Sequence, residues 1–115
     1  MITVEGLRAY GANVDEGLSR CMNMEEFYLK LVEKALKDRA FDELKTAVDD
    51  NDLDAAFEAA HRLKGAVGNL SLTPLYEVIE EMVELLRNRK KADYNAYLDR
   101  LENARKPLED LMNPD

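Results

Sequence analysis

Apolar residues recur every three or four positions along most of the chain, which is the spacing of a single buried face on an α-helix. Runs rich in Val, Ile and Thr, which favour strands, are missing from the sequence. No internal repeat or Gly/Ser-rich linker interrupts the pattern. We therefore expect one all-α domain over residues 1–115, with helices that close on one another as an up-and-down bundle. The helices are expected over residues 4–10, 14–18, 24–38, 41–48, 53–70, 74–87 and 94–108.

Capping residues mark the predicted helix ends in the first half of the chain. Thr3 can accept a hydrogen bond at the start of the first helix, and Gly11 can end it. Asn23 followed by Glu26 resembles a capping box and predicts the start of the third helix. The apolar face of that helix is expected to contain Phe27, Leu31, Val32, Ala35 and Leu36.

The fifth and sixth helices are predicted to form an antiparallel hairpin. Asn51 or Asp52 is expected to cap the fifth helix, because short polar side chains suit that position. Thr73 is expected to cap the sixth helix, with Pro74 at its first position. The connection between the two helices is therefore short.

The last helix carries one conflicting signal. Asp93 can cap its start. Pro107 lacks a backbone donor and disfavours helical geometry at the preceding residue. We expect a break or kink at this proline.

Charge and cysteine content exclude several classes of function. The 24 acidic and 16 basic side chains give a formal net charge of -8, which disfavours binding to nucleic acids and to anionic membranes. Cys21 is the single cysteine, so no intramolecular disulfide and no cysteine-rich metal site is expected. No basic leader and no apolar run of roughly 20 residues is present. These features favour a cytoplasmic protein without a membrane segment.

The single histidine is predicted to point away from the core. At about 100° per residue, the apolar positions of the fifth helix cluster on one arc, and His61 lies roughly 130° from its centre. His61 should therefore face solvent. The arc consists of Leu53, Ala56, Ala60, Leu63, Val67 and Leu70.

Two glycines lie close to His61 on the same helix. Gly65 and Gly68 follow it by four and seven positions, and each glycine in a helix interior costs about 1 kcal/mol relative to alanine. Phe57 lies one turn before His61 on the same face. We expect the missing side chains to leave an open floor on which another protein can approach the imidazole.

These residues favour phosphoryl transfer through a partner. An imidazole has a reference pKa of about 6.5, so near neutral pH a ring nitrogen can act as a nucleophile. Lys64 can place its ammonium group against phosphoryl oxygens. The sequence contains no Gly-rich nucleotide loop, and phosphoryl transfer usually needs a metal ion. The pattern therefore indicates a carrier, not an enzyme, with the metal and second acceptor group supplied by a partner.

The segment from Ala60 to Leu70, AHRLKGAVGNL, closely resembles the motif of histidine-phosphotransfer (HPt) domains of multistep phosphorelays. The resemblance implies an antiparallel four-helix bundle with an additional short N-terminal helix, phosphorylation of His61, and motif roles for Lys64 and Gly65. It implies receiver domains as partners, whose aspartate exchanges the phosphoryl group with the histidine in the presence of Mg²⁺. The chain would bind no cofactor itself and act as a monomer. It would accept the group from one receiver domain, or a kinase, and pass it to another.

One position departs from the family pattern. Many similar domains have Gln or Glu on the following helix near the position of Val83, where it can reach the histidine. Val83 cannot form a hydrogen bond with a phosphoryl group. The docking surface for receiver domains is expected to include Val14, Leu18, Phe57, Arg62, Gly65, Gly68, Asn69 and Leu72.

Other classes of function remain open. The chain could be a helical adaptor that binds receiver domains without accepting phosphate, or the phosphoacceptor domain of a larger sensor kinase. Arg62 could serve only as a solubilising charge. Basic residues from Arg87 to Lys91 are expected at a helix C-terminus because of the helix dipole alone.

Overall fold

The computed structural model of the chain describes residues 1–113, which contain seven α-helices and no strand. The prediction of an all-α fold is confirmed. No helix in these residues is both long enough and apolar enough to cross a bilayer. The helices are α1 (Val4–Tyr10), α2 (Val14–Arg20), α3 (Glu25–Leu36), α4 (Ala40–Asp49), α5 (Leu53–Asn69), α6 (Thr73–Arg87) and α7 (Tyr94–Met112).

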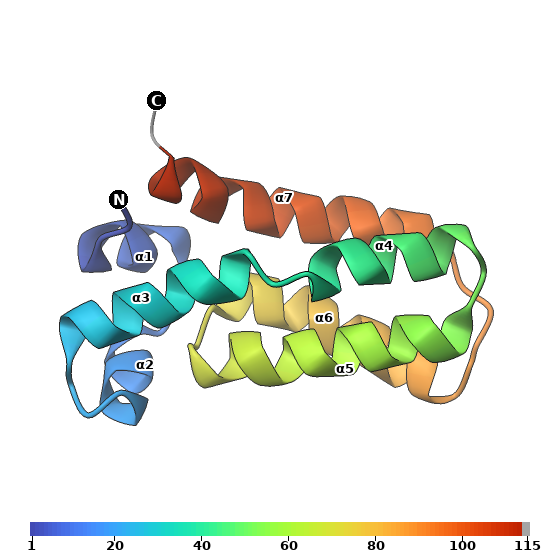
Figure 1. The fold of residues 1–115 in the computed structure, drawn as a ribbon, viewed down its shortest axis with the longest axis horizontal. Coiled ribbons are helices and arrows are strands. Elements are labelled where there is room, and N and C mark those ends of the chain that lie inside the picture. Colours follow the sequence, from blue (N-terminus) through green and yellow to red (C-terminus); the bar gives the residue numbers. More distant parts are fainter. Residues whose placement is uncertain (114–115) are drawn as a thin grey trace.

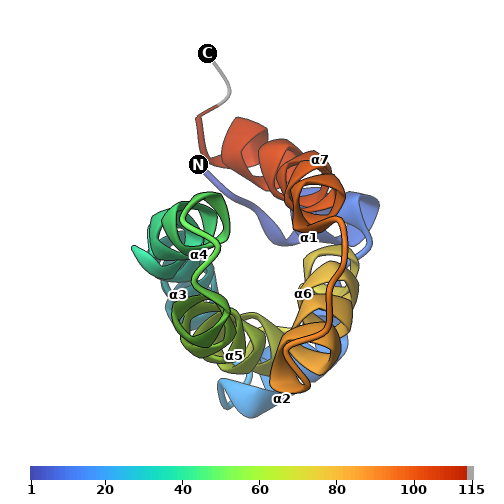
Figure 2. The same cartoon turned by 90° about the vertical axis from the view of Figure 1, so that its right-hand side faces the viewer.

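The longer helices lie side by side around a shared apolar core. Figure 1 shows α3 and α4 following one another along one side, with α5, α6 and α7 running back and forth beside them. In the end-on view of Figure 2, these segments surround a common interior. Apolar side chains fill that interior, and the largest fully buried ones include Tyr28, Leu36, Leu44, Leu63, Leu75, Ile79, Met82, Leu86 and Leu108. Burial of this apolar surface is the main force that holds the helices together.

The two N-terminal helices pack at the end of the molecule where α5 turns into α6 (Figure 1). The last carbonyl groups of a helix lack partners within the helix. Here the backbone N–H of Asn13 donates to the Ser71 carbonyl at 2.9 Å, and the Tyr28 hydroxyl donates to the Leu70 carbonyl at 2.8 Å. These bonds fix α2 and α3 against the α5–α6 turn.

Gly17 allows the close approach of α2 and α3. A Cβ atom at Gly17 would lie 2.6 Å from Cε1 of Tyr28, a distance that would force the buried ring to move. The Tyr28 ring is fully buried, and its hydroxyl is committed to the α5–α6 turn. A side chain at position 17 would therefore displace the ring that connects α3 to the rest of the molecule.

Several of the predicted helix ends are confirmed. The Thr3 side chain accepts a hydrogen bond from the Gly6 N–H, and Gly11 ends α1 with a left-handed φ of 111°. The Asp52 side chain accepts from the Ala55 N–H at the start of α5. At the start of α7, Asp93 does the same with the Ala96 N–H at 3.1 Å.

Two predicted caps were wrong. Asn23 does not cap α3: its backbone is left-handed, with φ of 59°, and its N–H donates to the Leu18 carbonyl, which closes the end of α2. Met24 is the N-cap residue of α3 and makes no side-chain cap bond. Thr73 is the first residue of α6, and Leu72 precedes it as the cap.

The apolar face of α3 differs from the prediction by one position. Phe27 is 48% exposed, whereas Tyr28 is fully buried. Phe27 lies four residues before Leu31 and Tyr28 lies four residues before Val32, so each ring has an apolar neighbour on its own face. The prediction for Phe27 was wrong because spacing alone does not show which of the two rings lies on the buried face of α3.

Helix α7 continues through Pro107 to Met112, so the predicted break is wrong. The proline removes one helix hydrogen bond and is exposed. Leu108, the next residue, is fully buried in the core. In addition, the Tyr10 hydroxyl of α1 donates to the Ala104 carbonyl at 2.7 Å. Packing on both sides of the proline offsets the missing bond.

The buried tyrosines predict a loss of stability at high pH. Burial raises the pKa of the Tyr28 phenol to about 12, and burial also raises the pKa of Tyr10. An unfolded tyrosine loses its proton near pH 10. Between pH 10 and about 12 the unfolded chain therefore binds fewer protons than the folded chain, and the free energy of unfolding falls as pH rises.

This loss can be measured by urea unfolding at pH 9, 10, 11 and 12. In Tyr28→Phe we expect a shallower fall across this window, with lower stability at pH 7 by about 1 kcal/mol from the lost hydrogen bond. Tyr97→Phe, at a partly exposed position on α7, is the matched control and should keep the wild-type slope. An equal slope in wild type and Tyr28→Phe would contradict the assignment to Tyr28.

Candidate functional site

His61 lies in the middle of α5 on the face that is turned away from the core. Its side chain is exposed, whereas Ala60 and Leu63 beside it are fully buried. The direction predicted from the helical periodicity is therefore observed. An exposed imidazole on a regular helix is accessible to a second protein without any change in the fold.

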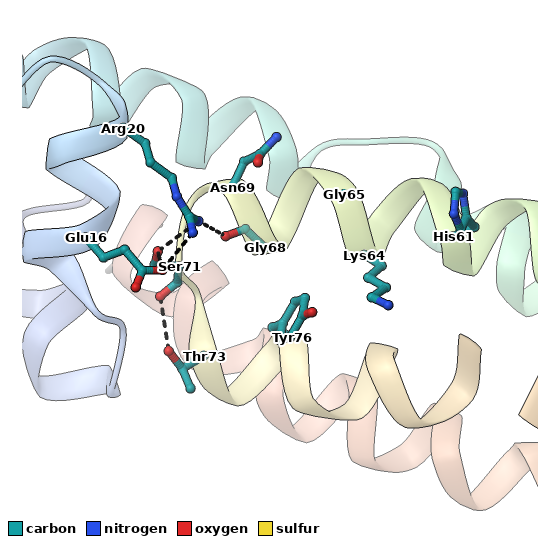
Figure 3. A pocket seen from close by; sticks show the side chains of 10 residues that line it. All are labelled: Glu16, Arg20, His61, Lys64, Gly65, Gly68, Asn69, Ser71, Thr73 and Tyr76. Carbon is teal, nitrogen blue, oxygen red and sulfur yellow. Dashed lines mark hydrogen bonds and ion pairs between the residues drawn. The ribbon is translucent and has the colours of Figure 1, made fainter. Parts of the chain in front are cut away.

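Gly65 leaves open space one turn after His61. A Cβ atom at this position would have no other atom within 4 Å, apart from its own helix backbone and chain neighbours. Lys64, which is partly buried, extends from α5 on the side of α6 (Figure 3). His61, Lys64 and Gly65 line one open groove of about 510 Å³. The cation and the clearance thus lie on the same side of the helix as the imidazole.

Gly68 has a different role from Gly65. A Cβ atom at Gly68 would lie 2.9 Å from Cε1 of Tyr76, so the ring of this α6 residue fills the space above it. A hydrogen bond with Glu80 raises the pKa of the Tyr76 phenol. The expectation that both glycines clear an open floor is therefore corrected: Gly65 does so, whereas Gly68 allows α5 and α6 to pack closely.

Helix α2 forms one wall of the groove, which sequence reasoning missed. Arg20 donates from Nη1 to the Gly68 carbonyl at 2.6 Å, and its Nη2 lies 3.1 Å from Glu16 (Figure 3). The Ser71 hydroxyl donates to the same Glu16 carboxylate at 2.8 Å. Arg20 and Gly68 are 48 residues apart in sequence, so no local pattern signals their contact.

Two residues predicted for the docking surface are not on the surface. Leu72 is 0% exposed and Val14 is 1% exposed, because both side chains pack into the core. Leu72 caps α6 at the tight turn after α5, and Val14 begins α2 beneath that turn. Leu18 is partly exposed, and Asn69 is exposed and lines the groove.

Arg62 forms an ion pair on the other side of His61. Its Nη2 lies 3.1 Å from the Asp38 carboxylate, which also accepts from the Ala40 N–H at the start of α4. Arg62 therefore connects α5 to the junction of α3 and α4. Its side chain is still 60% exposed, so the predicted contact with a partner stays a prediction.

Phe57 contacts His61 and is partly buried. The two ring centroids are 5.6 Å apart, with the ring planes inclined by 32°. The guanidinium carbons of Arg87 and Arg89 lie 5.6 Å and 5.0 Å from the Phe57 centroid. Phe57 is therefore covered by arginines that sequence reasoning assigned only to the helix dipole.

Val83 is fully buried in α6, so its side chain belongs to the core and does not reach the site. The structure thus offers no polar group at this position for a phosphorylated histidine. Among residues 1–113, no group of three or more His, Cys, Asp or Glu side chains is arranged to bind a metal ion.

Comparison with protein families agrees with this arrangement. The family model described as Hpt domain matches residues 28–112. The chain belongs to the Hpt domain family. Hpt domains act in phosphotransfer within two-component systems, as phosphocarriers and not as catalysts, and they interact with receiver domains. Comparisons with curated proteins and with solved structures gave no match.

The Hpt match includes His61 and the groove residues of α5 and α6. It begins at residue 28 in α3, so α1 and α2 lie outside it. The Glu16 and Arg20 wall of the groove therefore lies outside the residues that the family model matches.

Proposed function

We propose that this chain is a phosphorelay intermediate in which His61 accepts a phosphoryl group from the aspartate of one receiver domain, or from a kinase, and passes it to another receiver domain. The observation that carries this proposal is the exposed His61 beside the open position above Gly65, within a chain of the Hpt family. The histidine is the only one in the sequence.

The transfer exchanges one bond to phosphorus for another. The lone pair of a neutral imidazole nitrogen attacks the phosphorus atom of an aspartyl phosphate, and a nitrogen–phosphorus bond forms. The bond between phosphorus and the carboxylate oxygen breaks, and its electron pair leaves with the aspartate. The imidazolium then loses the proton of its other nitrogen to water. Passing the group onward reverses these steps at a second aspartate.

Lys64 and Gly65 support the transfer in different ways. The ammonium group of Lys64, on the same groove, offsets the negative charge of the phosphoryl oxygens. Gly65 admits the receiver domain to bonding distance because no side chain stands above it. Mg²⁺ in the receiver domain supplies the remaining charge stabilisation.

We further propose that α3–α4, α5, α6 and α7 form the antiparallel four-helix bundle of the family. Helices α1 and α2 belong to the same domain, because Tyr10 of α1 donates to the Ala104 carbonyl of α7 and Arg20 of α2 donates to the Gly68 carbonyl near the end of α5. Receiver domains dock over the groove, with Leu18, Gly65 and Asn69 at the interface.

The test is phosphotransfer to the wild-type chain from receiver domains that carry radiolabelled phosphate, in the presence of Mg²⁺. We expect label on the chain that is lost in acid and retained in alkali, as for a phosphorus–nitrogen bond. Transfer should stop when EDTA removes Mg²⁺. If candidate receiver domains bind the chain but none of them transfers phosphate to it, the result would favour the adaptor function instead.

A further inference from the structure

The Phe57 ring is the aromatic neighbour of the phosphoacceptor imidazole. Phe57 precedes His61 by one helical turn, so the two side chains lie on the same face of α5. Their centroid separation of 5.6 Å lies within the range of favourable aromatic pairs, and the rings are inclined by 32°. The contact restricts an exposed side chain that would otherwise move freely between rotamers.

The Phe57 ring is itself held by cations from the end of α6. Arg89 lies 5.0 Å from the ring centroid, and Arg87 lies 5.6 Å from it. Guanidinium groups are attracted to aromatic faces at these distances. The ring of Phe57 is therefore flanked by His61 along α5 and by arginines from the α6 side.

Two further hydrogen bonds fix the Arg89 guanidinium, and so they fix its position against the Phe57 ring. Its Nε donates to the Asp54 carboxylate at 2.6 Å, and its Nη1 donates to the Leu86 carbonyl at 2.5 Å. Asp54 lies on α5 three residues before Phe57. A chain of contacts thus connects the start of α5, the end of α6, the Phe57 ring and the imidazole.

We propose that Phe57 is a positioning residue, which holds the His61 imidazole in the orientation that a receiver aspartyl phosphate requires. This rests on the proposed function of His61. Small errors in the position of a reacting group cost large factors in rate, so a fixed orientation favours transfer. The guanidinium groups of Arg87 and Arg89 already lie against the Phe57 ring, which favours a positioning role over direct contact with a partner.

The first measurement needs no phosphate. Because His61 is the only histidine, its ring-proton resonances can be assigned directly by NMR. In Phe57→Leu, which keeps an apolar side chain without an aromatic ring, these resonances should shift toward the values of a free histidine. In Phe57→Tyr they should stay near wild type.

The second measurement is transfer from a phosphorylated receiver domain. In Phe57→Leu we expect a threefold to tenfold lower rate constant at saturating receiver, roughly the value of one aromatic pair, with KM unchanged. Phe57→Tyr should restore the wild-type rate. Arg89→Gln, which loosens the support of the ring, should lower the rate constant in the same direction by a smaller factor.

Phe27→Leu is the matched control, because it makes the same substitution at an exposed position on α3. It should change neither the His61 resonances nor the transfer. An unchanged rate constant in Phe57→Leu would overturn the proposal even if the resonances shift, because loss of the ring current alone can shift them. A higher KM with an unchanged rate constant would also overturn it and would identify a docking contact. Failure of the wild-type chain to accept phosphate would instead contradict the proposed function, while the NMR comparison would still test the contact between Phe57 and His61.

Discussion

Replacement of His61 with glutamine is expected to abolish phosphate uptake from every receiver domain that phosphorylates the wild-type chain. The glutamine amide keeps polarity and approximate size but offers no nucleophilic nitrogen at neutral pH. No second histidine exists in the sequence to take over. The measurement is acid-labile radiolabel on the variant after incubation with a phosphorylated receiver domain and Mg²⁺, with wild type in parallel.

Loss of label is informative only if the variant folds and docks normally. His61 is exposed, so its replacement should change the free energy of unfolding by no more than about 0.5 kcal/mol. Affinity for an unphosphorylated receiver domain should also stay close to wild type. Acid-labile phosphate on His61→Gln at wild-type level would show that another residue accepts the group.

The features that the sequence predicted correctly have local signals. The direction of His61 follows from the spacing of apolar residues within one helix. The same holds for the caps at Thr3, Asp52 and Asp93, whose side chains bond within three residues. Such features depend on neighbours in sequence, so periodicity and capping rules can predict them.

The features that the sequence did not predict depend on distant contacts. Tyr28 is buried against Gly17 of α2, and Phe27 was chosen wrongly because nothing local separates the two rings. Leu72 was assigned to the surface, although the tight α5–α6 turn directs it into the core. The bond from Arg20 to Gly68 joins residues that only the finished fold brings together.

The two glycines after His61 make the same point, since similar spacing conceals different roles. Gly65 faces open space, whereas Gly68 faces the Tyr76 ring. The sequence indicated that both lie near the histidine. Only the position of α6 shows that Gly65 leaves space for a partner, whereas Gly68 allows close packing of the helices.

Gly65→Ala is accordingly expected to stabilise the fold while it slows phosphotransfer. Alanine is favoured over glycine in a helix interior by about 1 kcal/mol, and the added methyl group meets no other side chain. The free energy of unfolding should therefore rise by 0.5 to 1 kcal/mol, as an approximate range from helix propensities. The longer side chain of Gly65→Gln should obstruct the receiver domain and lower the transfer rate by about a hundredfold. Urea unfolding and single-turnover transfer measure the two effects.

Gly68→Ala is the matched variant, because it adds the same methyl group one turn further along α5. There the methyl group would lie 2.9 Å from the Tyr76 ring, which must move to admit it, so the gain in stability should be smaller than at position 65. Higher stability of Gly65→Ala, together with slower transfer in Gly65→Gln, would show that Gly65 serves transfer and is not required by the fold. A glycine required for packing would instead lose stability as well as transfer when it is replaced. Undiminished transfer in Gly65→Gln would contradict the docking of receiver domains over this face of α5.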